Sequence, residues 1–149
     1  MRGERSDPQT VLAFDFGLKR IGIAAGDTLT STAAPRPAVA VHQQEPDWDT
    51  IAREVRMLSP QMLVVGAPYN ADGSPGTLAP AARRFAAELE RRFGLPVNMV
   101  DERWSSLEAG AALKAQRSRG ERKRRVRKGD IDSAAAAVIL ERWLTGEGQ

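Results

Sequence analysis

The sequence predicts a mixed α/β fold, a sheet covered by helices, from the order of its apolar segments. Two short apolar runs, residues 11–14 and 21–25, are separated by a segment that begins with Gly17, a pattern typical of a β-hairpin. Further along the chain, segments with apolar residues at helical spacing alternate with short apolar runs. A hairpin followed by alternating helices and strands indicates a mixed sheet with helices packed on it.

The first half of the chain carries four predicted strands and one helix. After the hairpin, a third strand is predicted over 37–41 and a fourth over 62–65. Between them, Asp47 is a helix-capping residue type and Pro60 is a helix breaker. Four apolar residues recur at helical spacing between these two positions: Trp48, Ile51, Val55 and Leu58. They predict an amphipathic helix that ends before Pro60.

The second half carries three predicted helices and a fifth strand. A helix over 80–93 is closed by Gly94, and a strand follows over 97–100. Ser105 and Glu108 have the spacing of a capping box, which predicts a helix over 107–115. The last helix, 131–144, is rich in alanine, with an apolar face made by Ala135, Val138, Ile139 and Trp143. The prediction is therefore one domain over 1–149 with a five-stranded sheet, in which residues 1–10 are flexible.

Composition excludes several classes of protein. A chain of 149 residues is about the size of one domain. It has no cysteine, which excludes disulfides, zinc thiolate sites and thiol catalysis. The first ten residues are polar and charged, and no run of about 20 apolar residues is present. We therefore expect a soluble, cytoplasmic protein with no membrane partner.

Positive charge is concentrated in residues 114–128. The net charge of the whole chain is +3, whereas this segment alone carries +8, with Glu121 as its single acid. A polyanion is the partner that this distribution favours, although a solvated basic loop is the alternative. No aromatic residue interrupts the segment, so stacking of bases on it is not expected. Its nine basic residues are Lys114, Arg117, Arg119, Arg122, Lys123, Arg124, Arg125, Arg127 and Lys128.

Carboxylates adjoin apolar runs at three places: Asp15, the pair Asp101 and Glu102, and Asp132. Burying a carboxylate costs free energy unless a positive group compensates it. Three carboxylates at the ends of buried elements therefore indicate a shared divalent cation, for which oxygen ligands are the usual choice. The pattern points to metal-assisted phosphoryl chemistry.

Each of these acids also has a structural alternative. Asp15 could simply form the turn before Gly17. Asp101 and Glu102 are adjacent in a predicted strand, so only one of them can face the site. Asp132 falls in the first turn of the predicted last helix, where a carboxylate stabilises the helix end, and Asp130 competes for that role.

Four ordered motifs resemble one family across almost the whole chain. They are FDFGLKRIGIAAGD at 14–27, VVGAPYNADGSPG at 64–76, VDERWSS at 100–106 and IDSAAAAVIL at 131–140. The chain is similar to the YqgF/RuvX family, whose members are described as Holliday-junction resolvase-like proteins and as pre-ribosomal-RNA nucleases. Ala67, Trp104 and Ser106 depart from residues common in the family, and none of them is a proposed ligand.

The resemblance implies a ribonuclease H-like fold and a metal-dependent endonuclease. Asp15, Glu102 and Asp132 would be the catalytic carboxylates, and together they would hold two Mg²⁺ or Mn²⁺ ions about 3.5 to 4 Å apart. The resemblance favours Glu102 over Asp101 and Asp132 over Asp130. The implied reaction is processing of the 5′ end of precursor 16S rRNA. Resolution of Holliday junctions is the alternative, and two coordinated cuts would require a two-fold homodimer.

Nucleic acid is therefore the expected partner. Lys19 and Arg20 follow Asp15 by four and five residues and are expected to contact backbone phosphates. Asn70, in the loop after the fourth strand, could donate its amide to a phosphate or only form a turn. The basic segment could hold a duplex or a branched junction. His42, the single histidine, is expected at the surface without a catalytic role.

Two other classes of function compete with the nuclease. The segment 11–25 also fits the nucleotide-binding fold of actin and sugar kinases, but a chain of this length supplies only one of the two domains that such proteins need. The other class is a nuclease-like fold that binds RNA or the ribosome without cutting. Affinity that does not depend on metal, with no cleavage, would distinguish that module from an enzyme.

Overall fold

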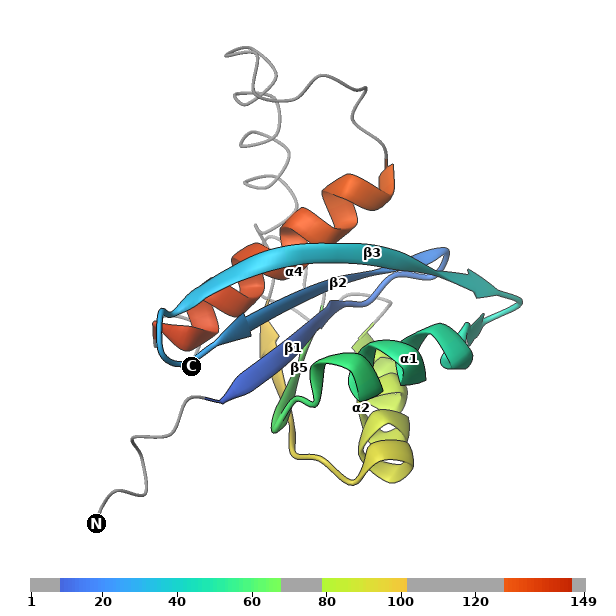
Figure 1. The fold of residues 1–149 in the computed structure, drawn as a ribbon. Helices are drawn as coiled ribbons and strands as arrows, with labels where there is room; N and C mark the ends of the chain where they lie inside the picture. Colours follow the sequence, from blue (N-terminus) through green and yellow to red (C-terminus); the bar gives the residue numbers. More distant parts are fainter. Residues whose placement is uncertain (1–8, 68–78, 102–127, 146–149) are drawn as a thin grey trace.

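A six-stranded mixed sheet organises the molecule (Figure 1). In the computed structural model, residues 9–67, 79–101 and 128–145 are described. Strand order across the sheet is β4-β3-β2-β1-β5-β6. β1 to β4 pair antiparallel in succession, whereas β5 is parallel to β1 and β6 is parallel to β5. The strands are β1 (Thr10–Asp15), β2 (Arg20–Asp27), β3 (Thr32–His42), β4 (Glu45–Pro46), β5 (Met62–Ala67) and β6 (Val97–Asp101).

The three described helices begin and end largely where local chemistry predicts. α1 (Trp48–Leu58) is capped by Asp47, whose carboxylate accepts from the Thr50 amide at 3.3 Å, and it ends at Ser59 in the left-handed conformation. α2 (Ala79–Phe93) is followed by Gly94, whose φ of +66° is the left-handed conformation that glycine adopts at low cost. The third described helix is α4 (Lys128–Leu144).

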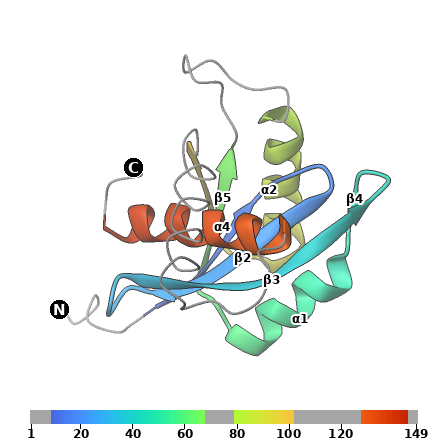
Figure 2. The same cartoon turned by 90° about the horizontal axis from the view of Figure 1, so that it is seen from above.

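These helices divide between the two faces of the sheet (Figures 1 and 2). α1 and α2 cover one face, over a core that includes Leu12, Phe14 and Phe85. α4 covers the other face, where small side chains such as Ala13 and Ala136 make up much of the core. Residues alternate between the two cores along β1, as the period of two in a strand requires. The sequence prediction of a mixed sheet flanked by helices is confirmed.

Apart from shifts of one or two residues at the ends of elements, two boundaries and one element differ from the prediction. The third strand starts at Thr32 instead of residue 37, because Pro35 and Pro37 are tolerated on a strand whose outer edge is mostly unpaired. A sixth strand of two residues, β4, pairs with the end of β3 and was not predicted. α4 begins at Lys128 instead of residue 131. The predicted helix over 107–115 lies outside the described residues.

Among the described residues, no helix has both the length and the apolar character needed to cross a bilayer.

Candidate active site

Asp15 is the last residue of β1 and lies on the face of the sheet that α4 covers. Val11 and Ala13 pack in the core under α4, so the period of two places Asp15 on the same face. Its register partners are Gly22 on β2 and Gly66 on β5. The Asp15 residue is only 7% exposed. Because glycine has no side chain, neither β2 nor β5 places a side chain at the register position of Asp15.

Gly22 brings the backbone of α4 into direct contact with the sheet beside Asp15. A Cβ atom added at Gly22 would stand 2.0 Å from the Asp132 carbonyl oxygen and 2.7 Å from the Ser133 nitrogen. Directly opposed residues of an antiparallel pair point to the same face, so the Asp15 side chain projects toward this part of α4. The glycine therefore brings Asp132 close to the end of β1.

The Ser133 hydroxyl fixes the same contact from the helix side. Ser133 is 3% exposed, and its Oγ accepts a hydrogen bond from the Ile23 amide at 3.3 Å. The pairing of β2 with β3 shifts register between Ile21 and Ile23, an irregularity that lies next to this bond. A buried bond between strand and helix ties the position of Asp132, the preceding residue, to β2.

Asp132 pairs with Arg20 at the start of β2. Arg20 Nε donates to Asp132 Oδ2 at 2.7 Å, and the two side chains are 36% and 25% exposed. The expectation that Asp132 lies in the first turn of the last helix was wrong, because α4 begins four residues earlier. Asp132 therefore does not cap this helix. Its carboxylate instead joins α4 to β2 beside the buried Asp15.

The third expected carboxylate, Glu102, lies outside the described residues. β6 ends at Asp101, and its Val100 packs in the core under α4. Among the described residues, no group of three or more His, Cys, Asp or Glu side chains is placed to hold a metal ion. The structure thus brings two of the three expected carboxylates, Asp15 and Asp132, to one region.

The expected nucleic-acid contacts are only partly described. Lys19 is exposed in the turn after β1, and Arg20 is held by Asp132. His42 is exposed at the end of β3, as predicted. Asn70, Arg119, Arg122, Lys123, Arg124, Arg125 and Arg127 lie outside the described residues, and only the backbone of Lys128 is described.

Sequence reasoning did not identify two residues that shape this region, Gly22 and Ser133, and it assigned Arg20 to phosphate contacts without predicting its ion pair with Asp132. The sequence did carry a pattern that could have identified Gly22. Gly22, Ala24 and Gly26 alternate on one strand, and the last helix carries the run Ala134 to Ala137. Small residues on two elements indicate close backbone packing, and here β2 and α4 pack together.

Comparison with known proteins agrees with the four sequence motifs. The family model described as "RuvX: Holliday junction resolvase" matches residues 9–146. A protein of Legionella pneumophila (strain Philadelphia 1) named "Putative pre-16S rRNA nuclease" is 45% identical over 133 residues, which cover 89% of this chain and 93% of that protein. A protein of Nitrosococcus oceani with the same name is 43% identical over 140 residues, covering 94% and 89% of the two chains.

Solved structures agree with the fold. RuvC of Thermus thermophilus, in complex with a Holliday junction substrate, superposes with a TM-score of 0.53 at 17% identity over 95% of this chain and 98% of that one. The yeast mitochondrial Holliday junction resolvase Ydc2 superposes with a TM-score of 0.52 at 10% identity over 92% and 78% of the two chains. The fold is therefore that of the ribonuclease H-like resolvases. On the family match and the identity to these relatives, the chain belongs to the RuvX family.

Proposed function

We propose that this protein is a metal-dependent endonuclease that hydrolyses phosphodiester bonds in structured RNA, and that it processes the 5′ end of precursor 16S rRNA. One observation supports this most strongly. The buried Asp15 ends β1 directly opposite Gly22, and at this glycine the Asp132 backbone of α4 touches the sheet. Relatives at 43–45% identity carry the name "Putative pre-16S rRNA nuclease", which supports the choice of substrate.

The donor atoms of this region fit a divalent metal. Carboxylate oxygens suit Mg²⁺ and Mn²⁺, and Asp15 and Asp132 supply donors of that class. We assign Asp15, Asp132 and Glu102 as the ligands of two Mg²⁺ or Mn²⁺ ions. Val100 faces α4, so the period of two along a strand favours Glu102 over Asp101 for that face. When bound, two such ions stabilise the attacking and leaving oxygens of the phosphodiester.

The residues around this site position the reacting groups. Hydrolysis adds the oxygen of a water molecule to phosphorus, breaks the bond to the leaving oxygen, and transfers a proton to that oxygen. The Ser133 bond and the Gly22 contact hold Asp132 in place before substrate arrives, so little reorganisation is needed. Arg20 can exchange its carboxylate partner for a phosphate oxygen, because a guanidinium binds both groups with paired hydrogen bonds.

Other cations supply affinity that does not depend on sequence. Lys19 is exposed in the turn after β1 and has no hydrogen-bond or ion-pair partner among the described residues. We propose that Lys19, Asn70 and the basic segment 114–128 contact the phosphate backbone. A segment of net charge +8 releases condensed counterions when it binds a polyanion, so the affinity should fall steeply as salt rises. From this proposed substrate we infer that the protein acts in the cytoplasm.

Holliday-junction resolution is the second candidate. The description of the family model and the likeness to RuvC favour it. A junction must be cut at two symmetric positions, so this reaction requires a two-fold homodimer. A protein that cuts as a monomer would therefore act on RNA and not as a junction resolvase.

The test is a cleavage assay with two labelled substrates, precursor 16S rRNA and a synthetic four-way DNA junction, in Mg²⁺, Mn²⁺ or chelator. We expect the wild type to cut the RNA only with metal, and Asp132→Asn to lose the activity. Asp27→Asn is the matched control, because Asp27 lies at the other end of β2, where its carboxylate accepts hydrogen bonds from the Leu29 and Thr30 amides. Binding of RNA without any cleavage, in every metal, would instead favour a non-catalytic RNA-binding module.

A further inference from the structure

The second turn of α2 carries two adjacent, exposed arginines, Arg83 and Arg84. α2 connects the parallel strands β5 and β6, so it runs back along the sheet and begins at the carboxyl end of β5. Phe85 agrees with this direction, because its ring centroid lies 5.4 Å from that of Phe16, the residue after Asp15. The two arginines therefore lie at the same end of the sheet as Asp15, on the face opposite α4.

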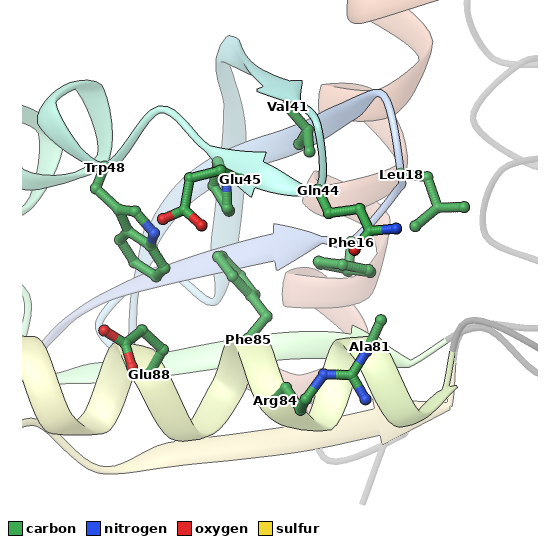
Figure 3. A pocket seen from close by; sticks show the side chains of 11 residues that line it. Phe16, Leu18, Val41, Gln44, Glu45, Trp48, Ala81, Arg84, Phe85 and Glu88 are labelled. Carbon is green, nitrogen blue, oxygen red and sulfur yellow. The ribbon is translucent and has the colours of Figure 1, made fainter.

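Figure 3 shows how Arg84 lies in this region. Its side chain runs along α2 toward Ala81 and the N-terminal end of the helix. Arg84 and Ala81 line a cavity of about 630 Å³ together with Leu18, an exposed residue of the turn after β1. Lys19, the next residue of that turn, adds a third cation to the same end of the sheet.

Two carboxylates also line this cavity, and neither forms an ion pair with Arg84 in the described parts of the chain. Glu88 accepts hydrogen bonds from Arg91 and Arg92 in the last turn of α2, and these partners lower its pKa to about 2. Glu45 is the other carboxylate, and it has no ion pair among the described residues. A carboxylate bound to the guanidinium would compete with a phosphate. Arg84 has no such bond to break when a phosphate arrives.

The other arginines of the described ranges are stabilised by negative charge within the fold. Arg56 and Arg142 lie in the last turns of α1 and α4, where the helix dipole favours a cation. Arg83 and Arg84 lie one turn from the positive end of α2, and its first turn holds no acid. Two adjacent cations in that position favour an anion from outside the protein. The remaining arginines each act on a carboxylate: Arg20, Arg36, Arg53, Arg91 and Arg92.

α4 approaches the same end of the sheet from the opposite face. Asp132, in its second turn, lies closely against Gly22 near the start of β2. The helix then runs toward the far end of that strand, where Leu140 approaches Gly26. α4 therefore begins at the end of the sheet that carries the candidate site. Lys128, its first residue, is also the last residue of the basic segment.

We propose that Arg83 and Arg84 bind the phosphate backbone of the substrate RNA on the α2 side of the sheet. The proposal rests on the proposed function, since its partner is the structured RNA that is cut. An RNA strand held both by these arginines and by the basic segment before α4 passes over the end of β1, where Asp15 lies. Phosphate contacts carry no sequence information, so this surface sets the position and affinity of the RNA and not the choice of base.

The test is a filter-binding titration of a labelled precursor 16S rRNA fragment with the full-length protein, in chelator so that no cleavage occurs, at several salt concentrations. Arg83→Gln with Arg84→Gln should weaken binding at least about 10-fold. The slope of log affinity against log salt concentration should become shallower by about 1.5, because two phosphate contacts no longer release counterions.

Arg53→Gln with Arg56→Gln is the matched control. It removes the same charge from two exposed arginines of α1, a helix that ends at the opposite end of the sheet, where β5 begins. We expect the control to bind within about twofold of wild type. Unchanged affinity and salt slope in the α2 double variant would overturn the proposal. An equal loss in the control would also overturn it, because the effect would then be one of net charge.

Steady-state cleavage in metal gives a second readout. The α2 double variant should raise KM about 10-fold and leave kcat within about twofold of wild type, because phosphate contacts away from the reacting bond stabilise the bound substrate and the transition state equally. A loss of kcat with KM unchanged would contradict a role in binding the RNA backbone.

A tethered probe locates the RNA directly. The chain has no cysteine, so Ala87→Cys provides a single attachment point for an iron chelate that cuts nearby RNA. Ala87 is exposed on α2, one turn after Arg83. Met57→Cys, at an exposed position in the last turn of α1, is the control. We expect cuts from position 87 and none from position 57. No cuts from position 87 would overturn the proposed path of the RNA.

The two proposals fail in different ways. Cleavage of RNA by the wild type, with affinity and KM unchanged in the α2 double variant, would overturn the phosphate surface and leave the nuclease intact. Binding that weakens in the α2 double variant alone, without cleavage of any substrate by the wild type in metal, would overturn the nuclease while the phosphate surface stands.

Discussion

Substituting alanine for Gly22 tests whether the contact between α4 and β2 holds the site together. The added Cβ would stand 2.0 Å from the Asp132 carbonyl oxygen and 2.2 Å from its carbonyl carbon. Both atoms belong to the helix backbone and cannot rotate away. Ordinary contacts begin at about 3.4 Å, so α4 and β2 must move apart by ~1.4 Å near Asp132 to reach one.

The movement has two consequences of different size. Overpacking of this kind costs about 1 to 3 kcal/mol of unfolding free energy. Loss of the bond from the Ile23 amide to Ser133 adds about 1 kcal/mol. For a domain of this length the melting temperature should therefore fall by about 5 to 12 °C. A displacement of about 1 Å in a catalytic group lowers the rate by roughly 100-fold, so Gly22→Ala should nearly abolish cleavage.

Two quantities are measured. One is the melting temperature, and the other is the rate of single-turnover cleavage of precursor 16S rRNA at a temperature below the unfolding transition of the variant. Leu89→Ala is the control, because Leu89 is fully buried in the core on the other face of the sheet. It should cost a similar or larger 2 to 5 kcal/mol while leaving the rate near that of wild type. A Gly22→Ala protein with wild-type melting and wild-type rate would refute the packing argument.

Three further predictions concern charged pairs. Arg20→Ala should bind Mn²⁺ about 3- to 10-fold more tightly by calorimetry, because the guanidinium no longer competes for Asp132, yet it should cut more slowly. Arg36→Met should cost about 1 to 3 kcal/mol in urea unfolding, because it leaves the buried Glu54 carboxylate without its two hydrogen bonds of 2.8 and 3.2 Å. Glu88→Gln should lower the melting temperature at pH 7. The pKa of Glu88 is depressed from 4.5 to about 2 by its arginine partners, so this difference should be full above about pH 4.5 and vanish near pH 2.

Each of these has an outcome that would contradict it. Unchanged or weaker Mn²⁺ binding by Arg20→Ala would show that the ion pair does not compete with metal. Adding Glu54→Leu to Arg36→Met removes the unpaired carboxylate and should restore most of the lost stability. If stability does not recover, the unpaired Glu54 carboxylate is not what destabilises Arg36→Met. A Glu88→Gln difference that stays constant from pH 7 to pH 2 would mean that ionisation of this carboxylate does not stabilise the fold.

Local signals predicted the elements where they were strong. The spacing of apolar residues behind Asp47, and Gly94 after the second helix, placed α1 and α2 within a residue of their observed ends. The prolines at 35 and 37 concealed the first half of β3, because the rule against proline in strands applies weakly at an edge. The two-residue β4 depends on the turn at Gln43 and Gln44, neither of which is a usual residue for it.

The candidate site was predicted as a set of residue types and not as an arrangement. Asp15 and Asp132 could be chosen because each adjoins an apolar run. That the Asp132 backbone lies against the strand next to Asp15 depends on Gly22, whose close approach to α4 is a tertiary contact between residues more than one hundred positions apart. The Arg20 partner of Asp132 is a contact of the same kind. Pairings across such separations are decided by packing, which no local pattern records.

The rate at which wild type and Asp15→Asn cut labelled precursor 16S rRNA, across a titration of Mn²⁺, tests the central claim most directly. The substitution removes a charge with almost no change in volume, and Asp49→Asn on the exposed side of α1 is its control. We predict cleavage that rises with Mn²⁺ for wild type and the control, and none for Asp15→Asn at any concentration. Equal cleavage by Asp15→Asn and wild type would contradict the assignment of this buried carboxylate to the active site.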